Sequence, residues 1–284
     1  MGLHANLTVM VTVEELNIYP LKSGRAIAKS SVRLAATGFE WDRWWMITDA
    51  AGSFLSQRTH PRLACIQPEL SDAGLTLRAP GLTPLTLPLE PGGESRTVQV
   101  WKDRCEGLDQ GDAASDWASA ALAQRVRVVR VPDAPRRMAD PQFAGPKPMP
   151  VAFTDGFSIL VCNRASLDCL NERMPEPVPM ERFRPNLVLH GLPPFAEDRI
   201  ASLQVGPVTL ALVKPCTRCV ITSTDQRTGE RSTNPLPFLR EFRFDRTLRG
   251  VTFGENAVPM AGIGTQIARG TECVVTYDAE PQNR

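Results

Sequence analysis

Histidine is scarce in this sequence, which has only three, His4, His60 and His190, spread along 284 residues. Most catalytic zinc sites use histidine ligands, and a Ser-His-Asp triad needs a histidine beside its nucleophile. The scarcity therefore argues against histidine-based zinc hydrolysis. It argues more weakly against a triad, since one well-placed histidine would suffice.

The sequence also lacks the features of membrane, secreted and nucleic-acid-binding proteins. No run approaches the roughly 20 apolar residues of a membrane span. Residues 1–13 have neither the basic start nor the unbroken apolar stretch of a signal peptide. The net charge of +1 gives no electrostatic reason to expect nucleic acid or a membrane surface as a partner. We expect a cytoplasmic protein without a membrane span.

Cysteine is present, but its pattern does not indicate a disulfide framework. The seven cysteines are Cys65, Cys105, Cys162, Cys169, Cys216, Cys219 and Cys273. An odd number in a chain of this size, without a secretion signal, indicates free thiols in a reducing compartment.

Short β-type runs, separated by glycine, proline and aspartate, dominate the first part of the sequence. The expected strands are 11–19, 31–34, 44–47, 63–67, 75–78, 85–88 and 96–101. Residues 49–52 have the composition of a hairpin turn between two of them. Strands at this spacing are typical of a barrel or a sandwich.

The composition changes from about residue 112 onwards. Asp112 is the expected N-cap of a helix that reaches Leu122, and a second helix is expected at 165–173. The proline-rich segments 132–150 and 174–179 are expected to be a surface loop and a break. Further strands are expected at 126–131, 158–161, 186–189, 203–205, 208–213, 250–253 and 272–277. The pattern predicts a mixed, β-rich fold in two parts, divided between about residues 95 and 125.

Cys216-Thr-Arg-Cys219 is a C-x-x-C motif with several competing interpretations. A structural zinc site needs four ligands, but no second C-x-x-C and no H-x₃₋₅-H is present. A thioredoxin-like motif belongs at a helix N-terminus in a βαβ unit, whereas here a strand-like run leads into it. A third interpretation is a single thiolate that binds a transition metal, with Lys214 and Arg218 lowering its pKa. Alternatively, both cysteines are small buried hydrophobic residues, as free cysteines often are.

Basic and polar residues gather at three expected loop–strand junctions, in Lys22-Ser23, Asp42-Arg43 and Arg184-Pro-Asn186. Such residues are usually no more than solvated. Clustered donors of this kind are nevertheless what a phosphate-bearing cofactor requires. Neither G-x-x-x-x-G-K-[ST] nor G-x-G-x-x-G is present, so a nucleotide held by those motifs is not expected.

Four segments carry a more specific pattern. They are Ile18-Tyr-Pro-Leu-Lys-Ser23, Asp42-Arg-Trp-Trp45, Phe183-Arg-Pro-Asn186 and Cys216-Thr-Arg-Cys-Val-Ile-Thr222, the last with Asp225 and Thr228-Gly229. Together and in this order they resemble the MOSC-domain molybdoenzymes, in particular the amidoxime-reducing component and the bacterial YcbX type. The resemblance runs from about residue 12 to 278 and includes Phe153-Thr-Asp155, Ala196-Glu-Asp198 and Phe253-Gly254.

The resemblance implies an N-terminal β-barrel-like domain over residues 1–105 and a β-barrel MOSC domain with a few short helices over residues 106–284. A molybdopterin cofactor would lie between them. Cys219 would be the catalytic thiolate ligand of molybdenum, for which a soft donor is suited, and Cys216 would not be a ligand. The other implied cofactor contacts are Lys22, Ser23, Arg43, Asp155, Gly156, Phe157, Arg184, Asn186, Thr217, Arg218 and Asn256. Asn256 departs from the tyrosine associated with that position in the family, and Ile200 lies near the place of a usual tryptophan.

The implied activity is molybdenum-cofactor-dependent reduction of N-hydroxylated compounds, namely hydroxylamines, amidoximes and N-hydroxylated bases, to an amine and water, a detoxification reaction. Electrons would come from a separate donor, such as a ferredoxin, a cytochrome b5-like protein or a flavoprotein reductase. The sequence has no plant-type C-x₄-C-x₂-C iron–sulfur spacing of its own. The alternative is a molybdenum-cofactor carrier or sulfur-transfer protein, because MOSC domains also occur in cofactor-sulfurating proteins.

Overall fold

The computed structural model describes residues 10–278, which consist mainly of β-strands and their connections. The predicted β-rich class is confirmed. His4 and most of the segment considered above as a signal peptide lie outside the described residues. Between residues 10 and 278, no helix is long and apolar enough to cross a membrane.

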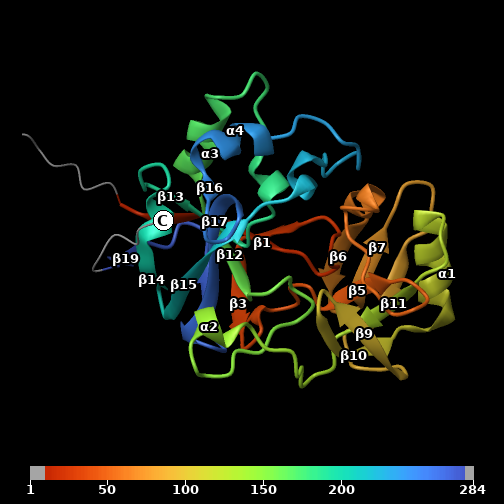
Figure 1. The fold of residues 1–284 in the computed structure, drawn as a ribbon. Helices are drawn as coiled ribbons and strands as arrows, with labels where there is room; N and C mark the ends of the chain where they lie inside the picture. The colour runs from red at the N-terminus through yellow and green to blue at the C-terminus, as the bar shows by residue number, and fades with distance from the viewer. Residues whose placement is uncertain (1–9, 279–284) are drawn as a thin grey trace, which may run out of the picture.

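A mixed nine-stranded sheet forms the larger part of the molecule (Figure 1). Its order is β19-β14-β15-β17-β12-β13-β1-β2, and β16 pairs with β17 outside this path. The β12–β13 pair is parallel, and the other pairs are antiparallel. The strands are β1 (Thr12–Ile18), β2 (Ile27–Lys29), β12 (Ile159–Asn163), β13 (Leu187–His190), β14 (Ile200–Val205), β15 (Val208–Thr217), β16 (Phe244–Asp245), β17 (Gly250–Ala261) and β19 (Cys273–Tyr277).

Apolar residues explain why β1 belongs to this sheet. Val13 and Leu16 are buried, and they share one core with Leu187 of the neighbouring strand β13. A small sheet adds Leu34 and Phe39 to the same core. Its strands are β3 (Ser31–Ala35), β4 (Gly38–Phe39) and β18 (Gln266–Ala268).

The smaller part of the molecule has its own core (Figure 1, right). A four-stranded sheet in the order β5-β11-β10-β9 and a three-stranded sheet in the order β6-β7-β8 belong to it, together with helix α1 (Gly111–Leu122). Trp45, Leu77 and Ala118 bring the two sheets and the helix into one apolar cluster. The strands are β5 (Trp45–Thr48), β6 (Gln67–Ser71), β7 (Gly74–Arg78), β8 (Leu85–Leu87), β9 (Ser95–Val100), β10 (Asp103–Asp109) and β11 (Arg127–Arg130).

The chain crosses from one part to the other more than once. Residues 12–39 form β1–β4 within the larger part, the strands from β5 to β11 form the smaller part, and β12 returns to the large sheet. The predicted division at residues 105 and 106 stays a prediction. The segment that follows it, with β11 and α1, packs with the smaller part.

Short helices pack against the large sheet near its central strands β12, β13 and β17 (Figure 1, top). Leu170 and Leu239 are buried there, beside Phe183 and Phe253, whose rings stack with centroids 4.0 Å apart. The helices outside the smaller part are α2 (Pro141–Ala144), α3 (Arg164–Asn171), α4 (Leu236–Phe242) and the 3₁₀ turns η2 (Met180–Phe183), η3 (Ala196–Arg199) and η4 (Val220–Ser223).

Two of the predicted elements are wrong in ways that have a physical reason. Residues 63–67 are not a strand, because Pro61 at the first turn starts the 3₁₀ helix η1 (Pro61–Cys65), and β6 begins only at Gln67. Asp112 is not the N-cap of α1, since Gln110 takes that position and the Asp112 carboxylate pairs with Arg127 at 2.7 Å.

Other predicted elements are confirmed with shifted bounds. The turn at 49–52 is confirmed by the hydrogen bond from the Gly52 N–H to the Asp49 carbonyl. The strand expected at 208–213 continues as β15 to Thr217, so it carries the first cysteine of the C-x-x-C motif. Helix α4 and strand β10 were not predicted.

Candidate functional site

One cavity brings together all the residues that the sequence nominated for the site. They come from the β1–β2 loop, the turn before β5, the irregular segment before β12, the η2–β13 junction, the β15–η4 junction and β17. These cavity-lining residues are Lys22, Ser23, Arg43, Asp155, Gly156, Phe157, Arg184, Asn186, Thr217, Arg218, Cys219 and Asn256. Their binding of a cofactor stays a prediction.

Three of these residues have a backbone conformation that is uncommon for residues other than glycine. Ser23, Arg43 and Arg184 have φ angles of 66°, 57° and 57°, in the left-handed region. Such conformations are costly, and they gather at binding and catalytic sites where the surrounding structure enforces them. The surrounding fold thus fixes how these three residues face the cavity.

Tyr19 holds two of the cavity's arginines. The guanidinium carbons of Arg43 and Arg184 lie 4.2 and 4.3 Å from the centroid of its ring, close enough for a cation–π contact. The ring is buried, and its hydroxyl donates a hydrogen bond to the Pro185 carbonyl at 3.0 Å. Burial lowers the pKa of Arg184 to about 10, so the group remains cationic at neutral pH.

Asn186 orients Arg43 from the other side. Its Oδ1 accepts hydrogen bonds from Arg43 Nη1 at 3.0 Å and from the Leu160 N–H at 3.1 Å, while its Nδ2 donates to the Asn17 carbonyl at 3.1 Å. Arg43 also pairs with the buried carboxylate of Asp42. Asn186 therefore uses most of its hydrogen-bonding capacity within the protein.

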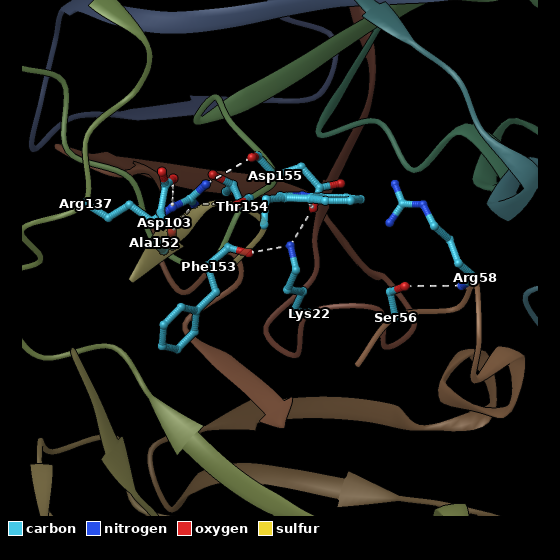
Figure 2. Close-up of polar contacts among 10 residues, drawn as sticks. Lys22, Ser56, Arg58, Asp103, Arg137, Ala152, Phe153, Thr154 and Asp155 are labelled. Carbon is cyan, nitrogen blue, oxygen red and sulfur yellow. Dashed lines mark hydrogen bonds and ion pairs between the residues drawn. The ribbon is translucent and has the colours of Figure 1, made fainter. Parts of the chain in front are cut away.

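Lys22 is a buried cation at the cavity wall (Figure 2). Its Nζ donates to the Phe153 carbonyl at 2.7 Å and to Asp155 Oδ1 at 2.6 Å. Burial lowers the pKa of Lys22 to about 8, although the Asp155 carboxylate opposes that change. The ammonium is thus charged at neutral pH but close to its titration range.

The two cysteines of the motif have different surroundings. Cys216 lies against the apolar cluster around Phe183, and its Sγ accepts a hydrogen bond from Arg218 Nη1 at 2.9 Å. Burial raises the pKa of the Cys216 thiol, against the effect of Arg218. Cys219 is half-buried, lines the cavity, and precedes η4 as its N-cap residue.

Arg218 and Lys214 are the two cations expected to activate a metal-binding thiolate, and both side chains contact other groups. Arg218 hydrogen-bonds Cys216 and the Phe183 carbonyl rather than Cys219. Lys214 lies over the ring of Phe143, 4.1 Å from its centroid. The sequence placed these two residues near the motif correctly, but it could not show which way their side chains turn.

Asn256 occupies a structural position as well as a place in the cavity wall. Its Nδ2 donates to the Lys214 carbonyl at 3.1 Å, at a point where the β15–β17 register shifts. The Asn256 amide is therefore bonded within the protein, at the β15–β17 pairing.

Sequence reasoning missed several residues of the cavity. Ser56, Arg58 and Thr154 line it, and the Arg58 guanidinium lies 4.3 Å from the centroid of the Trp101 ring. Thr154 lies within the quoted Phe-Thr-Asp segment, so its position carried a signal. Ser56 and Arg58 lie in no motif, and only the fold brings them to the site (Figure 2).

The cavity fits a ligand that has an anionic end and a metal. Its lining includes five cationic side chains, Lys22, Arg43, Arg58, Arg184 and Arg218, and one carboxylate, that of Asp155. Within the described part of the chain, Arg218 Nε and Thr154 Oγ1 are buried polar atoms without a hydrogen-bond partner, and buried donors of this kind require one. Cys219 supplies the soft donor.

Comparison with known families and proteins gives the same picture. Residues 10–125 match the MOSC N-terminal beta barrel domain, and residues 148–271 match the MOSC domain. The chain belongs to the MOSC-domain family. The MOSC chain is 33% identical over 242 residues to mitochondrial amidoxime-reducing component 1 of Mus musculus, an alignment that covers 82% of this chain and 71% of the relative. The corresponding Homo sapiens protein is 34% identical over 248 residues, covering 82% and 72%.

Another kind of relative is also similar to this MOSC chain. The molybdenum cofactor sulfurase of Danio rerio is 31% identical over 284 aligned residues, which cover 90% of this chain. The chain spans about a third of that protein, 34% of its length. The relatives therefore support a molybdenum-related function for the family member described here.

Proposed function

We propose that this MOSC protein is a molybdenum-cofactor-dependent reductase of N-hydroxylated compounds. The observation that carries the proposal is the single cavity in which the Cys219 thiol and a set of buried or half-buried cations meet. The family relatives named amidoxime-reducing component give the substrate class, since an amidoxime contains an N-hydroxyl group.

The chain's own residues would divide the binding of the cofactor between two ends of the cavity. Cys219 would supply the thiolate to molybdenum, and the other sulfur donors would come from the pterin. Lys22, Arg43 and Arg184 would bind the phosphate, for which arginine offers paired donors and lysine a point charge. Arg218 Nε and Thr154 Oγ1 would find their missing partners on the ligand.

The bound cofactor would supply the two-electron chemistry that protein side chains lack. The overall reaction balances as R–NHOH plus two electrons and two protons giving R–NH₂ and water. The electrons would come from a separate donor protein, a ferredoxin, a cytochrome b5-like protein or a flavoprotein reductase. We place the reaction in the cytoplasm, where it would detoxify hydroxylamines, amidoximes and N-hydroxylated bases.

The alternative is a cofactor carrier or a sulfur-transfer protein. The similarity to a molybdenum cofactor sulfurase favours it, because that alignment covers 90% of this chain. A carrier would use the same cations and the same thiol, so bound molybdenum alone does not separate the two functions. Turnover of an N-hydroxylated substrate does.

The experiment is to produce the full chain in a host that makes molybdenum cofactor, and to measure both molybdenum content and reduction of benzamidoxime or hydroxylaminopurine with an artificial reductant. Cys219→Ala should abolish the reduction, and Cys216→Ala should retain it. The reverse result would overturn the assignment of the ligand. Stoichiometric molybdenum without reduction of any of these substrates would favour the carrier.

A further inference from the structure

Arg137 lies in the proline-rich segment expected to be a surface loop, yet its side chain is buried. Its Nη1 donates to the carbonyls of Ala152 and Thr154 at 3.1 and 2.5 Å, and its Nη2 donates to the Asp155 carbonyl at 3.0 Å. Its Nε donates to Asp103 Oδ2 at 2.9 Å, in β10. One guanidinium therefore binds three carbonyls of a short segment and ties them to the smaller part of the molecule (Figure 2).

The segment of residues 152–155 also binds Lys22, through the Phe153 carbonyl, which Arg137 does not contact. The Phe153 carbonyl accepts from Lys22 Nζ at 2.7 Å, and the Phe153 N–H donates to the Arg43 carbonyl at 3.0 Å. The carbonyls of residues 152 and 154 thus go to Arg137, and that of residue 153 goes to Lys22. The bent segment therefore directs its carbonyls to two different donors.

The contacts of residue 137 require an arginine rather than a lysine. Arginine has five N–H donors in a fixed plane and stays charged when buried, so it can bind several carbonyls at once. Lysine in the same place would offer a single charged nitrogen. The segment of residues 152–155 has no regular secondary structure of its own to satisfy these carbonyls, and Arg137 takes that role.

We propose that Arg137 is a positioning residue, which fixes the 152–155 segment so that Lys22 presents its ammonium to the anionic end of the ligand. The inference rests on the proposed function, because it assigns Lys22 to the cofactor's phosphate. Arg137 itself is absent from the lining of the cavity and acts from behind its wall, where it borders a second cavity of about 790 Å³.

The test is a double-mutant cycle in the full chain, with inorganic phosphate as the probe and calorimetry as the measurement. Lys22→Met and Arg137→Gln should each weaken phosphate binding about tenfold or more, as expected for loss of a charge-assisted hydrogen bond. In the Lys22→Met background, Arg137→Gln should change the affinity by less than about twofold, because the two residues act through one another. An equal loss in both backgrounds would overturn the proposal.

Two further variants separate positioning from general damage. Arg136→Gln removes the neighbouring arginine, which is exposed at the second cavity, and should leave phosphate affinity unchanged. Arg137→Lys keeps a charge but not the planar set of donors, so it should weaken phosphate binding nearly as much as Arg137→Gln. The two variants should unfold at similar urea concentrations. Wild-type affinity in Arg137→Lys, or no saturable phosphate binding by the wild type, would also overturn the proposal.

Failure of this inference is distinguishable from failure of the proposed function. The cycle reports phosphate binding and needs no molybdenum. A non-additive cycle in a protein that neither loads molybdenum nor reduces benzamidoxime would refute the reductase and leave Arg137 in its role. An additive cycle in an active, molybdenum-loaded protein would refute only the role of Arg137.

Discussion

Lys22 and Asp155, which lie 133 positions apart in the sequence, form an ion pair of 2.6 Å at the wall of the candidate site. The ammonium is buried, whereas the carboxylate remains largely exposed, with a side-chain accessibility of 60%. Asp155 also accepts a hydrogen bond from Trp101 Nε1 at 3.0 Å. The ammonium therefore lies on the buried side of the pair, and the carboxylate lies on its exposed side.

Sulfate binding to the cavity should weaken as the pH rises above about 8. Burial lowers the pKa of Lys22 to about 8, so the ammonium is present below that pH and is lost above it, while sulfate itself does not titrate in this range. Calorimetry between about pH 6 and pH 9, below the pKa of Arg184, measures the effect. In Lys22→Met the affinity should be low and nearly constant, and a constant wild-type affinity would contradict the assignment.

The same pKa has an opposite consequence for stability. Because the folded value lies below that of an ordinary lysine, the unfolded chain binds the proton more tightly. The contribution of Lys22 to the free energy of unfolding should therefore increase as the pH rises from about 8 towards the ordinary lysine value. The difference between wild type and Lys22→Met in urea unfolding, followed over this range, checks the sign.

Replacement of Tyr19 should separate the hydroxyl from the ring. Tyr19→Phe removes only the hydrogen bond to Pro185, and should cost about 1 kcal/mol in the free energy of unfolding while leaving sulfate affinity within about twofold. Tyr19→Leu also removes the surface against which Arg43 and Arg184 lie, and should cost about 2–4 kcal/mol and weaken sulfate binding clearly. Equal sulfate affinity in the two variants would contradict the role given to the ring.

Glu197 should make the protein less stable as the pH rises from about 4.5 to 7. It is fully buried, with one carboxylate oxygen accepting from Ser166 Oγ at 2.8 Å, and burial raises its pKa to about 7. In this window the folded protein binds the proton more tightly than the unfolded chain does, so stability is greatest at the acidic end. Glu197→Gln should remove this dependence and be more stable at pH 8 by up to about 3 kcal/mol. Parallel stability curves for the two proteins would refute the prediction.

Gly254 should tolerate no side chain. Its φ is +74°, and a Cβ there would lie 2.6 Å from Cys162 Sγ and 2.7 Å from the Val161 carbonyl, both in β12. Gly254→Ala should lower the free energy of unfolding by about 2–5 kcal/mol, from overpacking together with backbone strain. Gly92→Ala is the matched control, because its Cβ would meet nothing within 4 Å. A Gly254→Ala protein as stable as Gly92→Ala would show that the β12–β17 contact is loose.

The sequence predicts the site better than it predicts the fold around it. Lys22, Arg43, Arg184 and Cys219 lie in short motifs whose residue types suit an anionic, metal-bearing ligand, and all four line one cavity. Whether they bind molybdenum cofactor stays a prediction. Local motifs carry this information because the chemistry depends on particular side chains at fixed short spacings.

The supporting residues are harder to predict because their partners are distant in the sequence. Arg137 contacts Asp103 and the 152–155 segment, and nothing in the proline-rich sequence around it distinguishes it from Arg136. Tyr19 belongs to the first motif, but its position against two arginines follows from strand pairing, which periodicity does not determine. The strand expected at 63–67 is wrong for a similar reason, since a single proline outweighs the apolar run that follows it.

The pairing of β1 with β13 has a consequence for how the protein is made. Thr12 lies opposite His190, so β1 has no partner on that edge until residues 187–190 have left the ribosome. An unpaired strand can pair with another chain and start aggregation. Pairing between strands that are far apart in the sequence is also slow. Production should therefore be sensitive to chaperone supply and to growth temperature, well before any question of cofactor loading arises.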